Sequence, residues 1–435
     1  MRAVDSVAGG AWYIAFLATA GLGACYLFLR RRRFDFCTIG FLGACFYFLP
    51  GFVGFAGYAE GFLLRPVAIL PGTYAIMCWV LFVLVFCAVL VDLAEHDNRA
   101  PTPTANESLH HMGTIATLAG VAGLVLTCAS VGTALLDPDK FALLALLNRW
   151  YLLWTTGAVL GLSITFLRRR WLLFAVNGLL LLANLYVGFR VDLVIAVLAL
   201  CAIVMARRGP ARFISYWRTG MLIAAFGVLL FVYKYILFAL KALDTDLLMA
   251  QISNPDAFKL IFLYSEPFVA QGTLNEVIRQ GFSVGADHLL SVFFLLVPFA
   301  NELGAEVVGF NDLFQPALFS SVTEYGLGSN IWAEMWAVGG WPAIVLFSVV
   351  FAAMLVSSSI MVRRLGPEAM ALLVTLAVYW SFYVHRNDLL YQLTLSRRIL
   401  MAWAVFALFA LAIDQLLGRV KLIIARECSS VEGYG

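Results

Sequence analysis

Long apolar runs separated by short polar turns make up most of the chain. Many of them approach 20 residues, the length that a helix needs to cross the hydrocarbon core of a bilayer. A transmembrane β-barrel would instead show alternating segments of about ten residues. The pattern therefore predicts an all-α polytopic membrane protein of about 11–12 transmembrane helices, with spans at about residues 11–29, 36–57, 72–94, 113–135, 151–167, 171–188, 191–206, 219–240, 337–361, 368–384 and 399–417.

One long polar stretch, residues 241–336, interrupts this pattern. It separates about eight N-terminal spans (1–240) from the C-terminal spans and tail (337–435), and we expect it to be a large periplasmic loop. Pro267, Pro298 and Pro316 predict that it folds as short helices rather than as one domain. The apolar run 289–299 is too short to span comfortably, so we interpret it as a re-entrant or interfacial helix.

Clusters of arginine predict the orientation of the chain. Residues 30–33 are four arginines that follow the first apolar run, whereas a cleavable signal peptide carries its positive charge before that run. Further arginine clusters follow at 168–170, 207–218 and 363–364. Because the predicted spans cross the membrane in alternating directions, these turns lie on the same side as residues 30–33. Because such clusters mark cytoplasmic turns, we predict a multi-pass protein with its N-terminus on the outer side of the membrane and its C-terminus in the cytoplasm.

Composition supports the membrane assignment and excludes several kinds of site. The 435 residues are 63% hydrophobic and 13% charged, about half the charged fraction of soluble domains. None of the eight cysteines falls in the polar loop, and no Cys-x-x-Cys or Cys/His spacing of a zinc site occurs. The pair His110-His111 and the i, i+2 pair Asp244/Asp246 are more typical of solvated loops and turns than of metal sites. We expect no metal, no cofactor and no nucleic-acid partner.

Five arginines are candidates for binding a phosphate-bearing ligand at the outer face. Planar guanidinium groups bind phosphate oxygens through two parallel hydrogen bonds, which lysine cannot do. Arg397 and Arg398 also lie together at a helix end predicted to be on the outer side, although arginine is usually concentrated on the cytoplasmic side. These candidates are Arg190, Arg279, Arg386, Arg397 and Arg398.

Each arginine also has a simpler interpretation. Arg190 lies in a tight outer turn, where it either snorkels to lipid headgroups or pairs with Asp192. Arg279 follows Glu276 by three residues, which is the spacing of a helix-surface ion pair. Lipid headgroups are alternative ligands for the remaining three.

Acidic residues of the polar loop are candidates for proton transfer. Glu334 lies one turn before an apolar span, among Trp332, Trp336 and Trp341, which suit a membrane interface. A helix cap with aromatic anchors would explain this arrangement without catalysis, although aromatic faces also stack on sugar rings.

Several short motifs together resemble the O-antigen and exopolysaccharide polymerases, the Wzy-type repeat-unit polymerases. They lie in residues 181–400: Gly188 and Arg190 opening a mid-chain helix, Ser265-Glu266, Leu296-Val297-Pro298, the block 326–334 (GLGSNIWAE) leading into Val338-Gly339-Gly340, and Arg386-Asn387-Asp388. Val338 and Asp192 depart from the residues that the family often has at these positions.

The resemblance implies a membrane glycosyltransferase related to the GT-C enzymes. Such an enzyme transfers a growing glycan from undecaprenyl diphosphate to the terminal sugar of a new lipid-linked repeat unit, at the periplasmic face of the bacterial inner (cytoplasmic) membrane. The resemblance thus implies a periplasmic N-terminus and a cytoplasmic C-terminus. Its partners would be undecaprenyl-diphosphate-linked oligosaccharides, membrane lipids and a chain-length regulator protein. The five arginines would bind diphosphate, and the base would be Glu334, followed by Glu266, Asp388 and His288. The alternatives are an O-antigen ligase of the same superfamily and a lipid-linked oligosaccharide transporter.

Overall fold

The computed structural model describes residues 2–60, 63–96, 109–137, 143, 145–242, 244–254, 265–294, 307–319 and 328–431. The chain divides into two compact units. The first contains Met1–Ala100, Val204–Val362 and Leu376–Arg397, and the second contains Pro101–Ile203, Arg363–Thr375 and Arg398–Gly435.

The chain is an all-α polytopic membrane protein. Among the described residues, six helices are long and apolar enough to cross a membrane: Gly10–Leu29, Pro71–Ala94, Met112–Leu136, Arg149–Leu167, Ile331–Met361 and Leu389–Leu417. Four other predicted spans coincide with helices, namely α8 (Trp171–Val187), α9 (Val191–Ala206), α10 (Trp217–Ala242) and α17 (Pro367–Tyr383). That these four cross the membrane stays a prediction.

The predicted continuous helix at 36–57 is wrong. The segment forms α2 (Phe36–Tyr47), the short α3 (Leu49–Val53) and then strand β2 (Phe55–Glu60). Pro50 lies in the first turn of α3, and Gly54 ends it with a φ of 84°. Because a left-handed residue stops a helix and glycine adopts that conformation without steric cost, the helix ends here and the chain continues as a strand.

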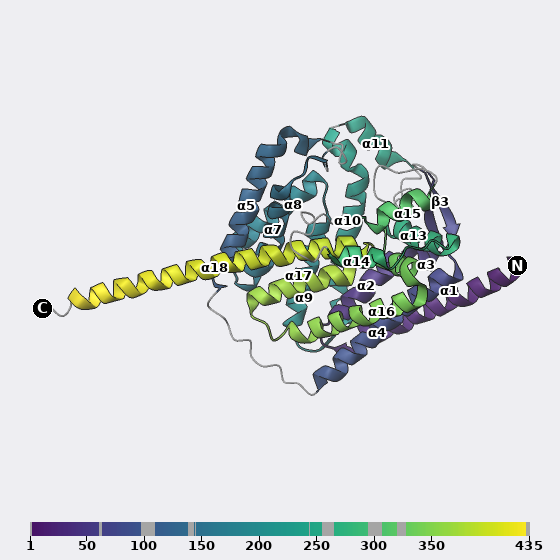
Figure 1. Ribbon diagram of the computed structural model, residues 1–435, viewed down its shortest axis with the longest axis horizontal. Helices are drawn as coiled ribbons and strands as arrows, with labels where there is room; N and C mark the ends of the chain where they lie inside the picture. The colour runs from purple at the N-terminus through teal and green to yellow at the C-terminus, as the bar shows by residue number, and fades with distance from the viewer. Residues whose placement is uncertain are drawn as a thin grey trace. The chain divides into compact units, whose positions relative to one another are not determined.

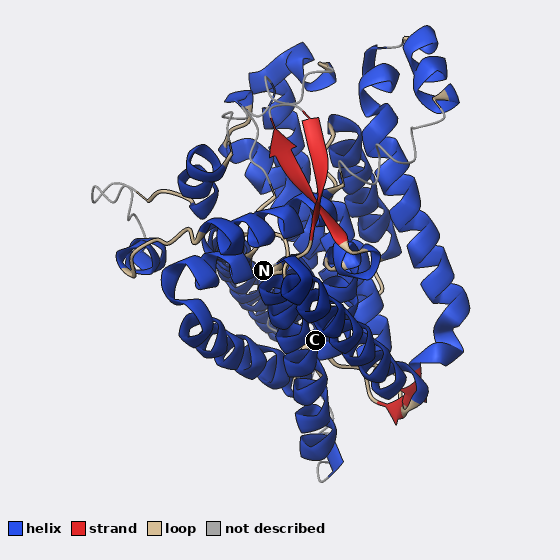
Figure 2. Ribbon diagram, turned by 90° about the vertical axis from the view of Figure 1, so that its right-hand side faces the viewer, coloured by secondary structure: helices blue, strands red, loops and turns tan. Residues whose placement is uncertain are grey.

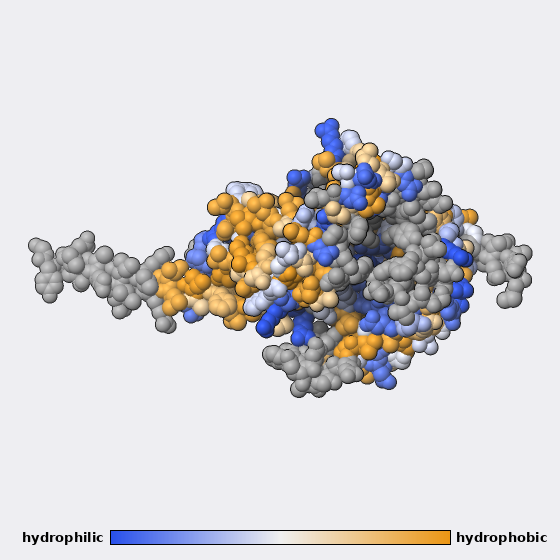
Figure 3. Space-filling model, turned by 90° about the horizontal axis from the view of Figure 1, so that it is seen from above, coloured by the Kyte–Doolittle hydropathy of each residue, from blue (hydrophilic) through white to orange (hydrophobic). Residues whose placement is uncertain are grey.

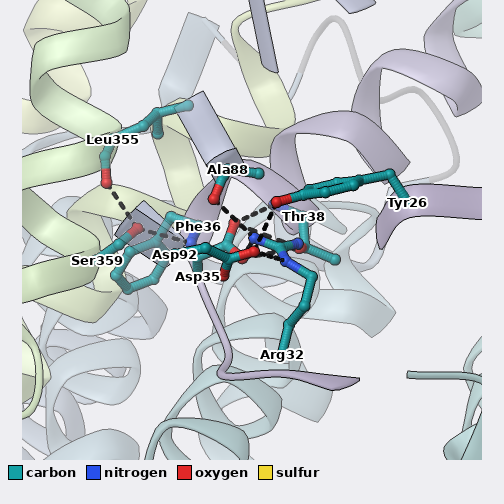
Figure 4. A network of polar contacts seen from close by, with 9 residues as sticks. All are labelled: Tyr26, Arg32, Asp35, Phe36, Thr38, Ala88, Asp92, Leu355 and Ser359. Carbon is teal, nitrogen blue, oxygen red and sulfur yellow. Dashed lines mark hydrogen bonds and ion pairs between the residues drawn. The ribbon is translucent and has the colours of Figure 1, made fainter. Parts of the chain in front are cut away.

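Helix α4 (Pro71–His96) is central to the packing of the first unit (Figure 1). It packs against α1 (Arg2–Ala24), α2 and α16 (Ile331–Met361), and α1 continues as the π-helix η1 (Cys25–Leu29). The end of η1 is tied to α2 and α4 by a buried network around Arg32, which Figure 4 shows from close by. The Arg32 guanidinium donates to Asp35 (2.9 Å) and Asp92 (2.7 Å), and Tyr26 also donates to Asp92 (2.7 Å).

Two small antiparallel sheets accompany the helices, both visible as red arrows in Figure 2. The two-residue strands β1 (Arg31–Arg32) and β4 (Ala211–Arg212) pair, and the short helix η4 (Phe213–Tyr216) follows β4. This pairing brings together two arginine clusters that were both predicted to be cytoplasmic. The second sheet is a hairpin of β2 and β3 (Leu63–Ala68), where the sequence predicts only a short loop.

The polar stretch contributes four described helices: α11 (Thr245–Ser253), α13 (Glu266–Gln280), α14 (Asp287–Phe294) and α15 (Phe310–Leu318). Helix α13 is largely buried and packs on β2, α2, α15 and α16. At Gly272 the contact is so close that a Cβ atom would lie 1.8 Å from the Gly57 carbonyl oxygen. The predicted helix at 289–299 is described only to residue 294, and Pro298 lies outside the described residues.

In the second unit, α5 (Met112–Val131), α7 (Arg149–Leu167) and α8 pack against one another, and the turn η3 (Gly132–Leu136) follows α5. Helices α5 and α7 approach closely, because a Cβ at Gly123 would lie 2.4 Å from the Trp154 nitrogen. The outer sides of α5 and α8 expose large apolar side chains such as Leu118, Val125 and Leu172. Figure 3 shows hydrophobic residues gathered over a broad area of the face that it displays, as expected of a surface that meets lipid.

Candidate active site

A buried glutamate–histidine pair is the centre of the candidate site in the first unit. The Glu334 side chain is 0% exposed, and its Oε1 lies 2.8 Å from His288 Nε2. Its second oxygen, Oε2, accepts a hydrogen bond of 2.6 Å from the backbone nitrogen of Leu389. Because both oxygens already have partners in a buried position, this carboxylate is placed to orient the histidine rather than to meet a substrate.

Local sequence explains why Glu334 lies at this point. Asn330 caps α16, accepting from the Ala333 nitrogen at 2.7 Å, and its amide donates to the Ala270 carbonyl of α13 at 2.8 Å. Gly339 and Gly340 take non-helical conformations, with a φ of 59° at Gly340. This kink divides α16, so its first eight residues take their direction from the contacts with α13 rather than from the apolar part that follows.

His288 lies at the start of α14 and is nearly buried, with 6% of its side chain exposed. Its ring lies beside the Phe310 ring of α15, with centroids 6.2 Å apart. When Nε2–H donates to Glu334, Nδ1 carries the lone pair that can accept a proton. The pair thus has the geometry of a histidine held by a carboxylate, which is a common arrangement for a general base.

Asp388 adjoins this pair and caps α18 (Leu389–Val431). Its Oδ1 accepts from the Tyr391 nitrogen at 2.9 Å, in the position of an N-cap side chain. Burial raises the pKa of the Asp388 carboxyl, and hydrogen bonds from the Tyr391 and Asn311 backbone nitrogens only partly oppose the rise. Asp388 therefore stabilises the N-terminus of α18, whose first residue, Leu389, contacts Glu334.

Arg386, on the turn that carries Asp388, forms an ion pair with Glu266 of α13. Arg386 Nε lies 2.7 Å from Glu266 Oε2, and Arg386 Nη1 donates to Asn387 at 3.2 Å. Burial lowers the pKa of the Arg386 guanidinium, but the Glu266 carboxylate and three nearby tyrosines together outweigh burial, so the net pKa is raised. Arg386 therefore stays charged, two residues along the chain from Asp388.

Two further residues of this site, His385 and Gln392, were not predicted from the sequence. His385 is fully buried, its Nδ1 accepts from Trp332 Nε1 at 3.1 Å, and burial lowers its pKa to about 3. Gln392, one turn after Asp388, is also fully buried, and neither side-chain polar atom has a partner in the part of the chain that the structure describes. A signal for His385 was present, because a histidine directly precedes the Arg386 motif.

The other four candidate arginines are divided between the two units. Arg279 donates to Glu276 on its own helix at 2.7 Å, which is the ion pair that its spacing allowed. In the second unit, Arg398 Nη2 donates to Asp192 Oδ1 at 3.2 Å. Arg190 directly precedes α9, and Arg397 belongs to the first unit.

Asp192 belongs to a chain of polar contacts, and its pairing with Arg190 stays a prediction. Besides Arg398, it accepts from Asn184 at 3.1 Å, and Asn184 in turn accepts from the Tyr151 hydroxyl at 2.9 Å. The chain Tyr151–Asn184–Asp192–Arg398 joins α7, α8, α9 and α18 within the second unit. Arg190 and Arg386 belong to different units, and their convergence on one ligand stays a prediction.

Among the described residues, no group of three or more His, Cys, Asp or Glu side chains is arranged to hold a metal ion. No protein-family model, curated protein or solved structure matches the chain.

Proposed function

We propose that the protein is a membrane glycosyltransferase that polymerises lipid-diphosphate-linked oligosaccharides, with His288 as the general base. The observation that carries the proposal is the buried Glu334–His288 pair. It is built from the polar stretch and lies at the N-terminal ends of two long apolar helices, α16 and α18. A proton acceptor at such a helix end can meet a substrate whose lipid part lies in the bilayer.

In the proposed reaction, His288 Nδ1 takes the proton of an acceptor sugar hydroxyl. The hydroxyl oxygen forms a bond with the anomeric carbon of the donor glycan, and the bond from that carbon to the diphosphate oxygen breaks. The leaving group is the lipid diphosphate, which departs with the bonding electron pair. Glu334 holds the His288 ring in the required tautomer and stabilises the imidazolium that forms.

Arg386 would stabilise the negative charge that develops on the departing diphosphate. It is a charged guanidinium on the turn that also carries Asp388, and it lies beside Glu266. Phosphate oxygens compete well for such a group, because the planar fork can bind two of them at once. Within the first unit, Glu266 then acts as the resting partner of Arg386 rather than as a base.

The length and apolarity of the six candidate spans favour a lipid-linked substrate over a soluble one. The sugars would be the repeat units of a surface polysaccharide such as O-antigen, as the resemblance implies. Within the proposal, buried amides such as Gln392 are suited to sugar hydroxyls.

The proposal is tested by deleting the gene and restoring it as wild type or as His288→Gln. We expect the deletion to leave single repeat units on the acceptor, wild type to restore long chains, and His288→Gln to behave as the deletion. The matched control is His111→Gln, since His111 also pairs with a carboxylate, Asp414 Oδ1 at 2.5 Å, but in the second unit. His111→Gln should restore long chains.

Two outcomes would contradict polymerisation. A deletion strain that accumulates long glycan on the carrier lipid would indicate the ligase alternative. A deletion strain that accumulates single lipid-linked repeat units which never reach the outer face of the membrane would indicate transport.

A further inference from the structure

A second polar feature of the first unit is a hollow beside the Arg32 network, far along the chain from the candidate active site. Its walls come from the end of η1, the segment 32–38, the end of α9 and the segment through β4 and η4. Two of its lining residues, Arg32 and Ala211, are paired across β1 and β4, and beside them Arg31 Nε donates to the Pro210 carbonyl at 3.0 Å. The hollow is therefore formed by parts of the chain about 180 residues apart that are bonded to each other.

Positive charge dominates the lining. Residues 30–38 and 205–216 contain seven arginines, no lysine and a single acid, Asp35. Asp35 and Asp92 are both engaged by Arg32. Arg33 and Arg208 also line the hollow, and neither forms an ion pair within the described ranges of the chain. Two guanidinium groups thus face one space with their charge available to a ligand.

The rest of the lining is largely apolar and aromatic. Leu27, Met205 and Phe213 contribute to it, and Tyr216 lies beneath the Arg208 guanidinium, 5.2 Å from ring centroid to Cζ. Leu27 belongs to the apolar span Gly10–Leu29, so the hollow lies at the end of a membrane-spanning helix. A small inorganic anion would use only the cationic side, whereas a phospholipid would use both.

We propose that this hollow binds the phosphate headgroup of an anionic phospholipid, with Arg33 and Arg208 as its ligands. Arginine suits the phosphate diester because each guanidinium presents two parallel donors. Its place at a span end, on a cluster predicted to be cytoplasmic, matches the leaflet in which anionic lipids attract basic residues. The contacts of Arg32 with Asp35 and Asp92 hold the backbone of the neighbouring Arg33 in place.

The test is native mass spectrometry of the purified full chain in detergent, titrated with phosphatidylglycerol or phosphatidylcholine. We expect wild type to retain phosphatidylglycerol in preference to phosphatidylcholine. The double variant Arg33→Gln/Arg208→Gln should bind phosphatidylglycerol at least about tenfold more weakly, because two charge-assisted hydrogen-bonding groups are lost.

A double variant Arg363→Gln/Arg364→Gln is the matched control, since it removes the same charge from another predicted cytoplasmic cluster outside the hollow. It should bind within about twofold of wild type, and all proteins should melt at the same temperature. Equal binding by wild type and the Arg33/Arg208 variant would overturn the proposal, as would an equal loss in the control. Displacement of the lipid by inorganic phosphate at matched concentration would show a site for free phosphate instead.

Discussion

Glu334 Oε1 lies 2.8 Å from His288 Nε2, although 46 residues separate the two in the chain. Glu334 lies in the first helical turn of a candidate membrane span, and His288 lies on a short amphipathic helix of the polar stretch. Their contact joins these two parts of the first unit. It also assigns different tasks to the two residues, since the carboxylate is enclosed and the histidine keeps a nitrogen for proton transfer.

Replacing either member of this pair should slow glycan transfer by different amounts. We expect His288→Gln to reduce the rate by about 10²–10⁴-fold, the usual contribution of a general base. Glu334→Gln keeps the size of the side chain and should cost less, because it misorients the base without removing it. Initial rates of chain elongation in isolated membranes measure both, and a larger loss in Glu334→Gln than in His288→Gln would reverse the assigned roles.

Arg386→Lys should lower the elongation rate by about 10²-fold while the protein stays folded, because lysine keeps the charge but cannot bind two phosphate oxygens in parallel. Arg364→Lys is the control, since Arg364 is exposed in the second unit. Rates and melting temperatures should be compared for both variants. An unchanged rate in Arg386→Lys would remove this residue from leaving-group stabilisation.

Acid should destabilise the first unit through His385. Burial lowers the pKa of this imidazole to about 3, so the folded state favours the neutral ring. The stability that follows is complete above the unfolded pKa of about 6.5 and is lost as the pH falls towards 3. The loss approaches roughly 1.4 kcal/mol for each pH unit below about 6.5. Melting temperatures of wild type and His385→Gln between pH 7.5 and 4.5 test this, since the variant should show a weaker acid dependence.

The Arg32 network should be essential for stability. Arg32→Met leaves the fully buried Asp35 and the partly exposed Asp92 without their cation, and the loss of a partner by a buried charge typically costs about 3–5 kcal/mol. Arg32→Met/Asp35→Asn removes one uncompensated charge as well and should recover part of the loss. Thermal unfolding in detergent orders the three proteins, and a double variant less stable than Arg32→Met would contradict this view of the network.

Gly272→Ala should destabilise the protein strongly, by roughly 3 kcal/mol or more, because the new methyl group would overlap the Gly57 backbone oxygen. Gly178→Ala on α8 is the matched control, since nothing lies within 4 Å of a Cβ at that position. The control should be neutral or slightly stabilising, as expected when alanine replaces glycine inside a helix. Equal melting temperatures for the two variants would refute the close contact between α13 and β2.

The apolar pattern was sufficient to predict the helices but not where every one of them ends. Span length follows from bilayer thickness, so runs such as 72–94 and 151–167 correspond closely to α4 and α7. The run 36–57 was wrongly predicted to be one continuous helix, because Pro50 and Gly54 lie inside an apolar stretch. Hydropathy measures the apolar character of a segment and not the backbone conformations that these two residues favour. The β2–β3 hairpin was missed for the same reason, since its pairing depends on backbone hydrogen bonds and on contact with α13.

The sequence was sufficient to select candidate residues by their chemical type, whereas assigning a role to each required the contacts seen in the structure. Glu334, His288 and Asp388 lie together, and Arg386 pairs with Glu266. No spacing rule links residue 288 to residue 334, because the kink at Gly339 and Gly340 and the packing on α13 decide where α16 begins. His385 lies in the turn between α17 and α18, yet it is fully buried and accepts a hydrogen bond from Trp332.

The most direct test of the central claim is elongation by the purified protein in vesicles. The substrate is the lipid-diphosphate-linked repeat unit extracted from the deletion strain, and products are sized by gel electrophoresis. Wild type should convert single units into a ladder of longer chains and release one lipid diphosphate for each linkage, whereas His288→Gln should leave single units. A ladder of the same length and rate from His288→Gln would show that the Glu334–His288 pair is not the catalytic centre.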